Sequence, residues 1–217
     1  MQVLKEELRL SIIRIARESF LEQGYDKTSM KDIALKLGVS VGNLYRYFPN
    51  KEALFEAVAK PAYDRLLTFI SDHEANPPAE FNGLSFMNEL GEILSDLLRT
   101  HRESLLILLY GSKGTSYEYT KEELVHQMTE HLRMHLTDYN SRCPDATPAD
   151  GKLSPAASGA AAPLDAIPIN PQVSRPLTVA FLEGYFEIIR LHADPEDIRE
   201  MTKHYVTVWF KGLLSLM

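Results

Sequence analysis

The chain has 217 residues, 45% of them hydrophobic, which is enough to bury one or two globular cores. Its net charge of −7 argues against attraction of nucleic acid over the whole surface. The single cysteine, Cys143, excludes an internal disulfide, and no apolar run approaches the roughly 18–20 residues that a membrane span needs. The amphipathic, acid-bearing first 20 residues do not resemble a signal peptide, so we expect a soluble cytoplasmic protein without a membrane span.

Charge is distributed unevenly along the chain. Residues 1–51 hold nine Lys or Arg against six Asp or Glu, a net +3, whereas the rest holds 14 against 24, a net −10. A basic end on an acidic body is typical of a protein that contacts phosphates with one end only. The plainer alternative is a chance distribution, because +3 is a modest excess.

The N-terminal region predicts two helices followed by a tight turn. Hydrophobic periodicity indicates a first helix over about residues 3–23, ended by Gly24. A second helix is expected from about Ser29 to Leu37, with Ser29 as its cap and Asp32 reaching back to the backbone N–H of that cap. Gly38 ends it, because a residue without Cβ enters the left-handed conformation at little steric cost.

A third helix is expected from Ser40 to about Phe48, where Pro49 ends it. Its apolar side should anchor it while its polar side faces outward, which completes a helix-turn-helix. The inward positions are expected to be Val41, Leu44 and Phe48, and the outward or flanking positions Gly42, Asn43, Tyr45, Arg46 and Tyr47.

The run TSMKDIALKLGVSVGNLYRYFPNKEALF, residues 28–55, resembles the DNA-binding domain of the TetR family of one-component transcriptional repressors. The similarity covers roughly residues 8–58, and the remaining chain matches that family only in length and helical character. The resemblance implies an all-α fold. A three-helix helix-turn-helix domain at residues 1–50 would precede a helical regulatory and dimerisation domain at residues 51–217.

The rest of the chain also predicts helices. Residues 50–71 are helical in pattern, and Pro61 predicts a kink or a break within them. Further helices are expected at residues 84–100, at 103–110, from 115 or 116 to 139, at 177–194 and at 198–216. Residues 140–176 hold seven prolines and an Ala/Ser/Gly run, which predicts an irregular insertion that buries little.

The last two predicted helices carry apolar positions on more than one side. One face suits the core of the chain itself, and the other suits a second copy, so that two such pairs would form a four-helix bundle. The alternative is that one chain buries both faces. The family resemblance also implies a homodimer, and a two-fold dimer predicts a palindromic operator in double-stranded DNA.

Each predicted DNA contact has a physical role. Thr28 and Ser29 lie at a helix N-terminus, where free N–H groups and the helix dipole favour a phosphate, and Lys51 can pair with another. Asn43 and Arg46 are the expected base readers, through bidentate contacts to adenine and guanine. The full predicted set is Thr28, Ser29, Ser40, Val41, Gly42, Asn43, Tyr45, Arg46, Tyr47 and Lys51.

Some of these positions have simpler explanations. Tyr45 and Tyr47 carry hydroxyls that can reach backbone oxygens, but they can instead pack the small domain, and Arg46 can be a solvated charge. Gly42 is expected to let the helix approach the groove closely. Val41, which can touch a thymine methyl, departs from the basic or small polar residue that is frequent there in the TetR family.

The family resemblance further implies that the C-terminal helices enclose a site for an unknown small-molecule effector, whose binding alters the spacing of the two DNA-reading ends. Candidate lining residues, each equally compatible with an ordinary core position, are Leu90, Leu94, Leu105, Leu109, Tyr117, Met128, His131, Phe181 and Tyr185.

His131 and His135 share one helix face at i and i+4, a spacing that can hold a metal. No second cluster completes the set, and the Glu that zinc proteases carry after the first His is absent, so we expect no metal, no cofactor and no enzymatic activity. Two alternatives to a ligand-responsive repressor stay open: a DNA-binding or adaptor protein without a small-molecule site, and a helical metal-dependent hydrolase.

Overall fold

The computed structural model describes residues 2–75, 83–142 and 168–214, and within these ranges the chain forms helices and no strand, which confirms the all-α prediction. The elements are α1 (Gln2–Lys27), α2 (Met30–Leu37), α3 (Val41–Tyr45), α4 (Lys51–Ala75), α5 (Gly83–Tyr110), α6 (Thr120–Arg142), the 3-10 turn η1 (Pro171–Val173), α7 (Ser174–Leu191) and α8 (Pro195–Leu214). Among these described helices, none combines the length and the apolar character needed to cross a bilayer.

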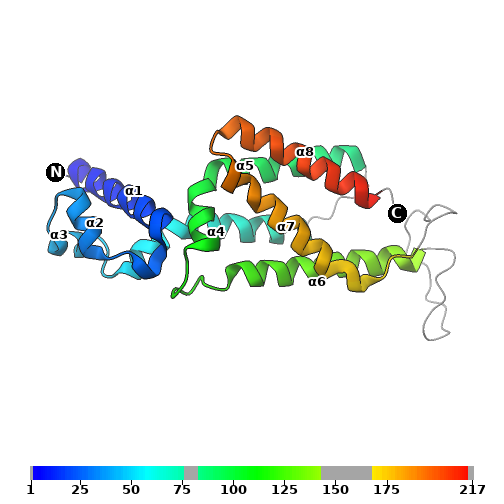
Figure 1. Cartoon of the computed structure of the whole chain (residues 1–217), viewed down its shortest axis with the longest axis horizontal. Helices are drawn as coiled ribbons and strands as arrows, with labels where there is room; N and C mark the ends of the chain where they lie inside the picture. The colour runs from blue at the N-terminus through cyan, green and yellow to red at the C-terminus, as the bar shows by residue number, and fades with distance from the viewer. Residues whose placement is uncertain (1, 76–82, 143–167, 215–217) are drawn as a thin grey trace.

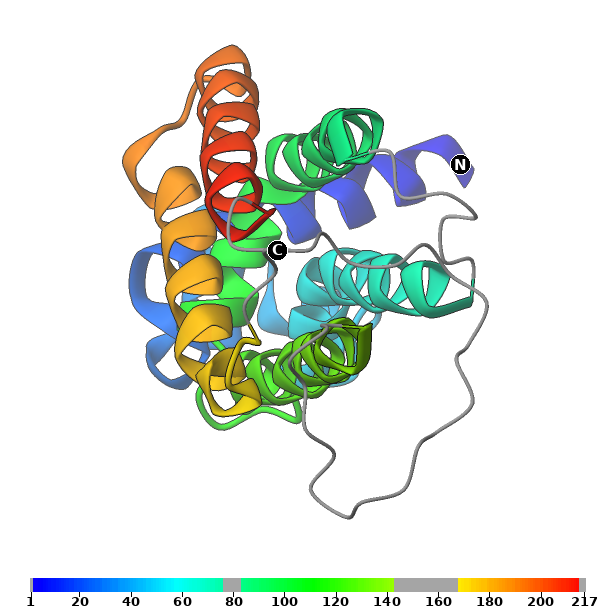
Figure 2. The same ribbon diagram turned by 90° about the vertical axis from the view of Figure 1, so that its right-hand side faces the viewer.

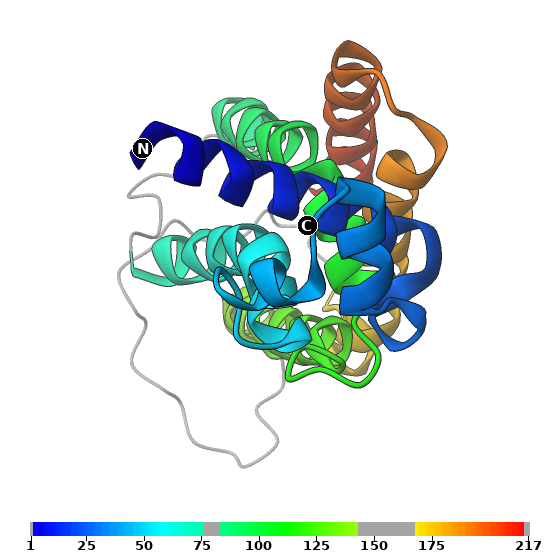
Figure 3. The same cartoon turned by 90° about the vertical axis from the view of Figure 1, so that its left-hand side faces the viewer.

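The molecule has two ends that α4 connects. Helices α1, α2 and α3 gather at one end, helices α5 to α8 make up the other, and α4 runs from the first group into the second (Figure 1). We call the first group, together with the start of α4, the head, and the second group the body. Viewed from the head side, α3 lies at the front of the molecule, away from α7 and α8 (Figure 3).

Side-chain caps set the bounds of the two short head helices, as the sequence predicts. The Ser29 hydroxyl accepts from the Asp32 N–H at 3.1 Å, and Gly38 ends α2 in the left-handed conformation at φ 69°. Asp32 differs from the prediction, because its carboxylate accepts from the Ser29 hydroxyl at 2.5 Å instead of from the backbone N–H. Ser40 caps α3 by accepting from the Asn43 N–H at 3.2 Å.

Helix α3 is shorter than predicted and ends at Tyr45 instead of near Phe48. The backbone N–H groups of Tyr47 and Phe48 both donate to the Leu44 carbonyl, so the chain tightens into a turn there. Pro49 explains the early end, because it disfavours helical geometry at the residue before it.

The head has its own apolar interior. The buried side chains come from α1, α2, α3 and the first turns of α4: Ile12, Ala16, Phe20, Ile33, Ala34, Leu44, Leu54, Phe55 and Val58. Fully burying one Leu, Ile or Phe side chain stabilises a fold by about 1.5–3 kcal/mol. The start of α4 is therefore part of the head's core, and α4 continues from there into the body.

Pro61 does not break α4, so of the predicted kink or break the break is wrong. Pro61 is exposed, whereas Ala59 and Ala62 beside it are fully buried. Packing of these neighbours outweighs the one backbone hydrogen bond that a proline removes. The domain boundary predicted between residues 50 and 51 thus falls where the continuous helix α4 begins. This boundary stays a prediction.

Helix bounds in the body differ from the predicted ones at several places. The predicted helices 84–100 and 103–110 are one helix, α5, with a kink at His101, whose φ of −116° and ψ of 18° are not helical. Helix α6 begins at Thr120, because residues 112–119 form turns in which Thr115 donates to the Ser112 carbonyl. Of the predicted irregular segment, residues 143–167 lie outside the described residues, and α7 begins three residues earlier than expected, at Ser174.

In the body, α8 packs along α5 and α7 along α6 (Figure 2). Gly184 permits the close approach of α7 and α8, since a Cβ there would collide with the Tyr205 ring. The Tyr205 hydroxyl donates to the carbonyls of Ala180 and Phe181 at 3.0 and 2.9 Å. These contacts tie α8 to α7.

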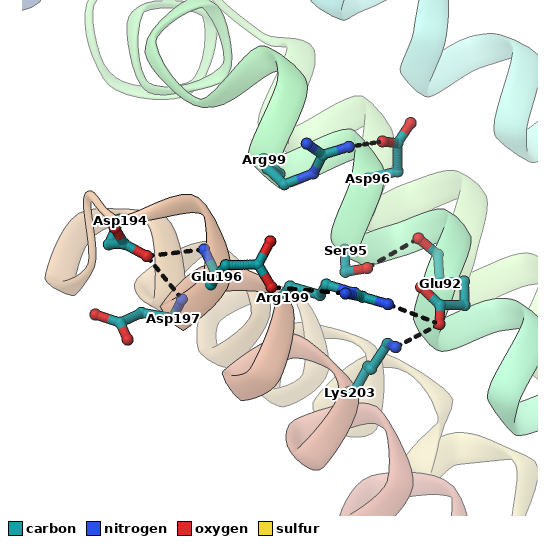
Figure 4. Close-up of polar contacts among 9 residues, drawn as sticks. All are labelled: Glu92, Ser95, Asp96, Arg99, Asp194, Glu196, Asp197, Arg199 and Lys203. Carbon is teal, nitrogen blue, oxygen red and sulfur yellow. Dashed lines mark hydrogen bonds and ion pairs between the residues drawn. The ribbon is translucent and has the colours of Figure 1, made fainter.

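A charged cluster on the outer edge holds α8 against α5 (Figure 4). Glu92 of α5 pairs with Lys203 and lies 3.6 Å from Arg199, and Arg199 also reaches Glu196 at 3.5 Å. The hydrogen bond from Lys203 lowers the pKa of the Glu92 carboxyl. Asp194 begins α8 by accepting from two backbone N–H groups of its first turn.

Candidate nucleic-acid interface

Helix α3 is anchored through its apolar side. Leu44 has no exposed surface and Phe48 is buried, while Val41 and Tyr47 are half-buried and pack against the same core. The Arg9 guanidinium lies 5.7 Å above the Phe48 ring and adds a contact from α1. The packing of α3 and of the turn that follows it on the head's core therefore fixes the position of α3.

The other side of α3 faces solvent. Tyr45 is 48% exposed, Gly42 and Arg46 are exposed, and Asn43 is half-buried. A Cβ placed on Gly42 would meet nothing within 4 Å, so this part of the helix has open space in front of it. An anchored helix with an open, polar outer face has the geometry that readout of the DNA major groove requires.

Thr28 does not lie on that open surface. Its side chain is 2% exposed, and its hydroxyl donates to the Gly24 carbonyl at 2.7 Å and to the Ser19 carbonyl at 3.2 Å. Both acceptors belong to the last turns of α1. Thr28 therefore joins α1 to the start of α2. Its backbone N–H donates to the Tyr25 carbonyl at 3.3 Å, so it is not one of the free N–H groups that were predicted to receive a phosphate.

Ser29 is half-buried and already holds Asp32 through two hydrogen bonds. The carboxylate at the α2 N-terminus complements the positive end of the helix dipole, which is the charge that a phosphate would otherwise supply. Two exposed lysines beside this terminus, Lys27 and Lys31, were not among the predicted contacts. Their exposure and their position beside the N-terminus of α2 make these two lysines candidate phosphate contacts.

Lys51 connects three elements of the head. Its Nζ donates to the Tyr25 carbonyl at 2.7 Å and to the Thr28 carbonyl at 3.0 Å, and lies 3.9 Å from the centre of the Tyr25 ring. Burial lowers the pKa of Lys51, while the nearby Asp26 carboxylate raises it. Two of its three donors thus satisfy backbone carbonyls at the end of α1, a role that the sequence prediction of a phosphate contact missed.

The contact between head and body is made at a pair of glycines. The Tyr25 N–H donates to the Gly111 carbonyl at 2.8 Å, and Gly24 has φ 78° beside it. Aromatic rings of the head lie behind this contact, where Tyr25 packs against Phe55 at a centroid distance of 5.3 Å, and Phe55 reaches Tyr117 of the body at 6.1 Å. The ends of α1 and α5 are consequently held together at backbone distance.

The predicted effector-site residues differ in burial and position. Six of them are buried in the core: Leu90, Leu94, Leu105, Leu109, Phe181 and Tyr185. Tyr117 is half-buried and lies by Phe55 and Tyr63, with centroid distances of 6.1 and 5.1 Å, on the head side of the body. Met128 and His131 are half-buried on α6.

Tyr185 is the most deeply placed polar group of that set. Its hydroxyl donates to the Leu94 carbonyl at 2.8 Å, its ring stacks on Phe181, and burial raises its pKa well above the usual value. Among the described residues, Thr202 is a buried hydroxyl on α8 that has no hydrogen-bond partner. Other buried hydroxyls of these helices are those of Ser95 on α5 and Thr178 on α7.

His131 and His135 do face each other across one turn of α6, with 3.0 Å between their Nε2 atoms. Within the described ranges, no group of three or more His, Cys, Asp or Glu side chains lies close enough together to hold a metal.

Comparison with known proteins agrees with this geometry. Residues 12–58 match the family model described as bacterial regulatory proteins, tetR family. The HTH-type transcriptional regulator UidR of Escherichia coli (strain K12) is 28% identical over 159 residues, which cover 71% of this chain and 74% of UidR. The HTH-type regulator YuxN of Bacillus subtilis is 30% identical over 130 residues, 60% of this chain and 42% of YuxN.

Solved structures show the same fold. The ketosteroid transcriptional regulator KstR2 of Mycobacterium tuberculosis aligns with a TM-score of 0.62 at 16% identity, covering 94% of this chain and 93% of that one. NalD, the secondary repressor of the MexAB-OprM multidrug efflux pump of Pseudomonas aeruginosa, aligns with a TM-score of 0.51 at 22% identity and covers 96% of both chains. On this evidence the chain carries, at residues 12–58, the helix-turn-helix domain of the tetR family of bacterial regulatory proteins, and as a whole it has the fold of the regulators KstR2 and NalD.

Proposed function

We propose that this regulator is a homodimeric repressor that binds a palindromic DNA operator through α3 and leaves it when a small molecule binds the body. The observation that carries the DNA part is the pairing of a fully buried Leu44 with an exposed Tyr45 and Arg46 on one short helix. Rigid anchoring allows the outward side chains to meet base edges without losing much conformational freedom.

The proposed base contacts are those of Asn43 and Arg46, with Tyr45 on the phosphate backbone. Ser29, Ser40, Gly42 and the half-buried Val41 and Tyr47 support the helix or line its edges. Lys27 and Lys31 are added as phosphate contacts, because they are exposed cations beside the N-terminus of α2. Thr28 and Lys51 are assigned instead to holding α1, α2 and α4 together.

Dimerisation is proposed through α7 and α8. Both helices expose large apolar side chains, with Leu191 72% and Val208 74% exposed, and the half-buried Trp209 and Phe210 lie beside Val208 along the chain. Apolar surface of this kind is favourably buried against a second copy. A two-fold dimer would then present two α3 helices to two equivalent half-sites.

The effector is proposed to bind among the buried residues of α5 and α7. An apolar molecule with one or two polar groups fits the character of these residues, which are leucines and aromatic rings together with the buried Tyr185 hydroxyl. Such a ligand would act only if it favours one spacing of the two heads over the other. KstR2 and NalD are described as regulators of ketosteroid and multidrug-efflux functions, and their likeness to this chain is one of fold.

Footprinting on the DNA that flanks the chain's own coding region tests the proposal directly. We expect protection of two half-sites related by a two-fold axis, about one helical turn or a small multiple of a turn apart. Protection of a single unrepeated half-site would contradict the dimer, and absence of any sequence preference would contradict the role of α3. A compound that raises Tm and releases the footprint would identify the effector.

A further inference from the structure

A pair of histidine side chains on the body has no part in the proposed reading of DNA. His131 and His135 lie one turn apart on α6, with ring centroids 4.4 Å apart and ring planes at 77°. Their Nε2 atoms are 3.0 Å apart. His131 is half-buried and His135 is exposed, so the pair is anchored at one side and accessible to solvent at the other.

Two imidazole nitrogens at this distance can share one proton or bind one metal ion. We propose that His131 and His135 form a binding site for a late divalent transition metal of the Cu(II) or Ni(II) class. Neutral imidazole nitrogen is a preferred ligand of these ions. The proposal depends on α6 alone and holds whether or not the chain binds DNA.

The distance between the nitrogens selects the type of ion. Metal–nitrogen bonds of about 2.0–2.1 Å to two atoms 3.0 Å apart make an angle of about 95° at the metal. Cu(II) and Ni(II) favour square-planar or tetragonal sites, in which neighbouring ligands lie near 90°. Tetrahedral Zn(II) would need the two nitrogens about 3.3 Å apart. Geometry and the general affinity order of these metals therefore both favour Cu(II), then Ni(II), over Zn(II).

The site is expected to exchange its metal readily. Glu130, an acidic neighbour on the same helix, is held by Arg133 through two hydrogen bonds, of 2.5 and 3.1 Å. Two histidine ligands hold a metal less tightly than the four ligands of a structural site, so the affinity is expected in the micromolar range. Protons compete for the same nitrogens, and lowering the pH releases the ion.

A metal across one turn of α6 would also stiffen that helix. Helix α6 packs along α7 and contacts η1, and it carries Met128 one turn before His131. Binding to the folded chain raises its stability by mass action, so Tm should rise with the concentration of Cu(II).

The test is a titration of the untagged full chain with CuCl₂ in a weakly coordinating buffer, followed by calorimetry and by the EPR spectrum of the bound ion. We expect one site of micromolar Kd whose EPR signal shows two nitrogen ligands, and weaker binding of Ni(II) and then of Zn(II). His131→Gln and His135→Gln should each weaken binding by about tenfold or more. His126→Gln, an exposed histidine of the same helix whose i+4 neighbour is Glu130, is the matched control and should leave Kd unchanged.

Circular dichroism and Tm measured in EDTA establish that each variant is folded as the parent is. Unchanged Kd in both substituted chains, loss of the site in His126→Gln, or an EPR signal with fewer than two nitrogens would each overturn the assignment. So would the absence of any site tighter than about 0.1 mM, because two preorganised imidazoles bind Cu(II) more strongly than that.

Discussion

Arg46 and Lys51 lie five residues apart, and the surroundings of each side chain decide its role. Arg46 is exposed at the end of α3, whereas the Lys51 ammonium sits on two backbone carbonyls and a tyrosine ring. Sequence position alone makes both of them candidate DNA contacts. The structure separates a side chain that can reach outward from one that is occupied inside the head.

Arg46→Ala should reduce discrimination between operator and random DNA. A good bidentate contact to guanine contributes about 1–3 kcal/mol of discrimination, or roughly 5- to 150-fold in Kd. Binding to random DNA should fall much less, because that binding depends on phosphate contacts. Gel-shift titrations on both DNAs measure the difference. Arg99→Ala, which removes an exposed arginine of the body paired with Asp96, is the matched control and should alter neither Kd. Equal losses on both DNAs would remove Arg46 from the base readers.

Lys51→Met should lower the stability of the fold in the absence of any DNA. The substitution keeps the apolar stem but deletes two charge-assisted hydrogen bonds to carbonyls, at a cost of about 1–3 kcal/mol in the free energy of unfolding. Urea denaturation followed by circular dichroism measures it. Lys31→Met, at an exposed lysine of α2, should change stability by less than about 0.5 kcal/mol. A fully stable Lys51→Met chain that binds DNA weakly would instead restore Lys51 as a phosphate contact.

At the scale of single residues, the sequence predicts helix caps well and tertiary contacts poorly. Ser29, Ser40 and Gly38 act as predicted, because each cap depends on residues no more than four positions away. Lys51 is predicted to contact a phosphate, yet its Nζ donates to the carbonyls of Tyr25 and Thr28, which are 26 and 23 positions away. No local pattern encodes the approach of these carbonyls to Lys51, so this role cannot be derived from the sequence.

At the scale of elements, the break predicted at Pro61 is absent, and the head and body also meet where α1 contacts α5. Helix α4 passes unbroken from head to body, while the ends of α1 and α5 touch through Gly24 and Gly111. The helix-breaking effect of Pro61 is overestimated from sequence, because the packing of the buried residues that flank it outweighs its low helix propensity. The glycine contact joins residues 87 positions apart, which periodicity cannot reveal. A signal from the body can therefore reach α3 along α4, or through the contact of Gly24 with Gly111 between α1 and α5.

Gly111→Ala should destabilise the contact between head and body. A Cβ at this position would lie 3.1 Å from the Ile107 carbonyl oxygen and 3.4 Å from the Phe20 carbonyl oxygen, both of them backbone atoms. Crowding of this kind typically costs about 1–3 kcal/mol, and urea denaturation measures it. Gly91→Ala, at a glycine within α5 whose Cβ would meet only Lys203 at ordinary distance, should be neutral or gain up to about 1 kcal/mol. If both variants have the same free energy of unfolding, the close contact between α1 and α5 contributes nothing to stability.

At the scale of the whole molecule, the head was predictable and the arrangement of the body was not. The linked motifs of residues 28–55 specify helix bounds, turn and outer face within a short stretch. In the body, periodicity identified the helices but not which ones pair, since the contact of α8 with α5 joins segments about 100 residues apart. The two helices predicted on either side of His101 form the single helix α5 for the same reason: tertiary packing, which the sequence pattern does not reveal, keeps the helix continuous across a residue with non-helical backbone angles.

The charge distribution agrees with the placement of the head at one end of the molecule. Residues 1–51 carry a net +3 and the remaining residues a net −10. A duplex is therefore repelled by the body and attracted only toward the end that holds α3 (Figure 3). Two heads of a dimer would each approach the DNA in this orientation, and a palindrome supplies the matching pair of half-sites.

Val208→Asp tests whether α8 provides the dimer contact on which that arrangement depends. Val208 is 74% exposed in the single chain, so the substitution leaves the monomer's own core intact. In an apolar interface the new carboxylate would be stripped of water, and the dimer should weaken by several kcal/mol. Sedimentation equilibrium should then show monomers, and operator binding should lose its dependence on the second half-site. Leu35→Asp, at a residue of α2 that is 79% exposed on the head, adds the same charge and should remain dimeric. If both variants sediment alike, the second copy is held by another face, and the two α3 helices are spaced by contacts other than those of α8.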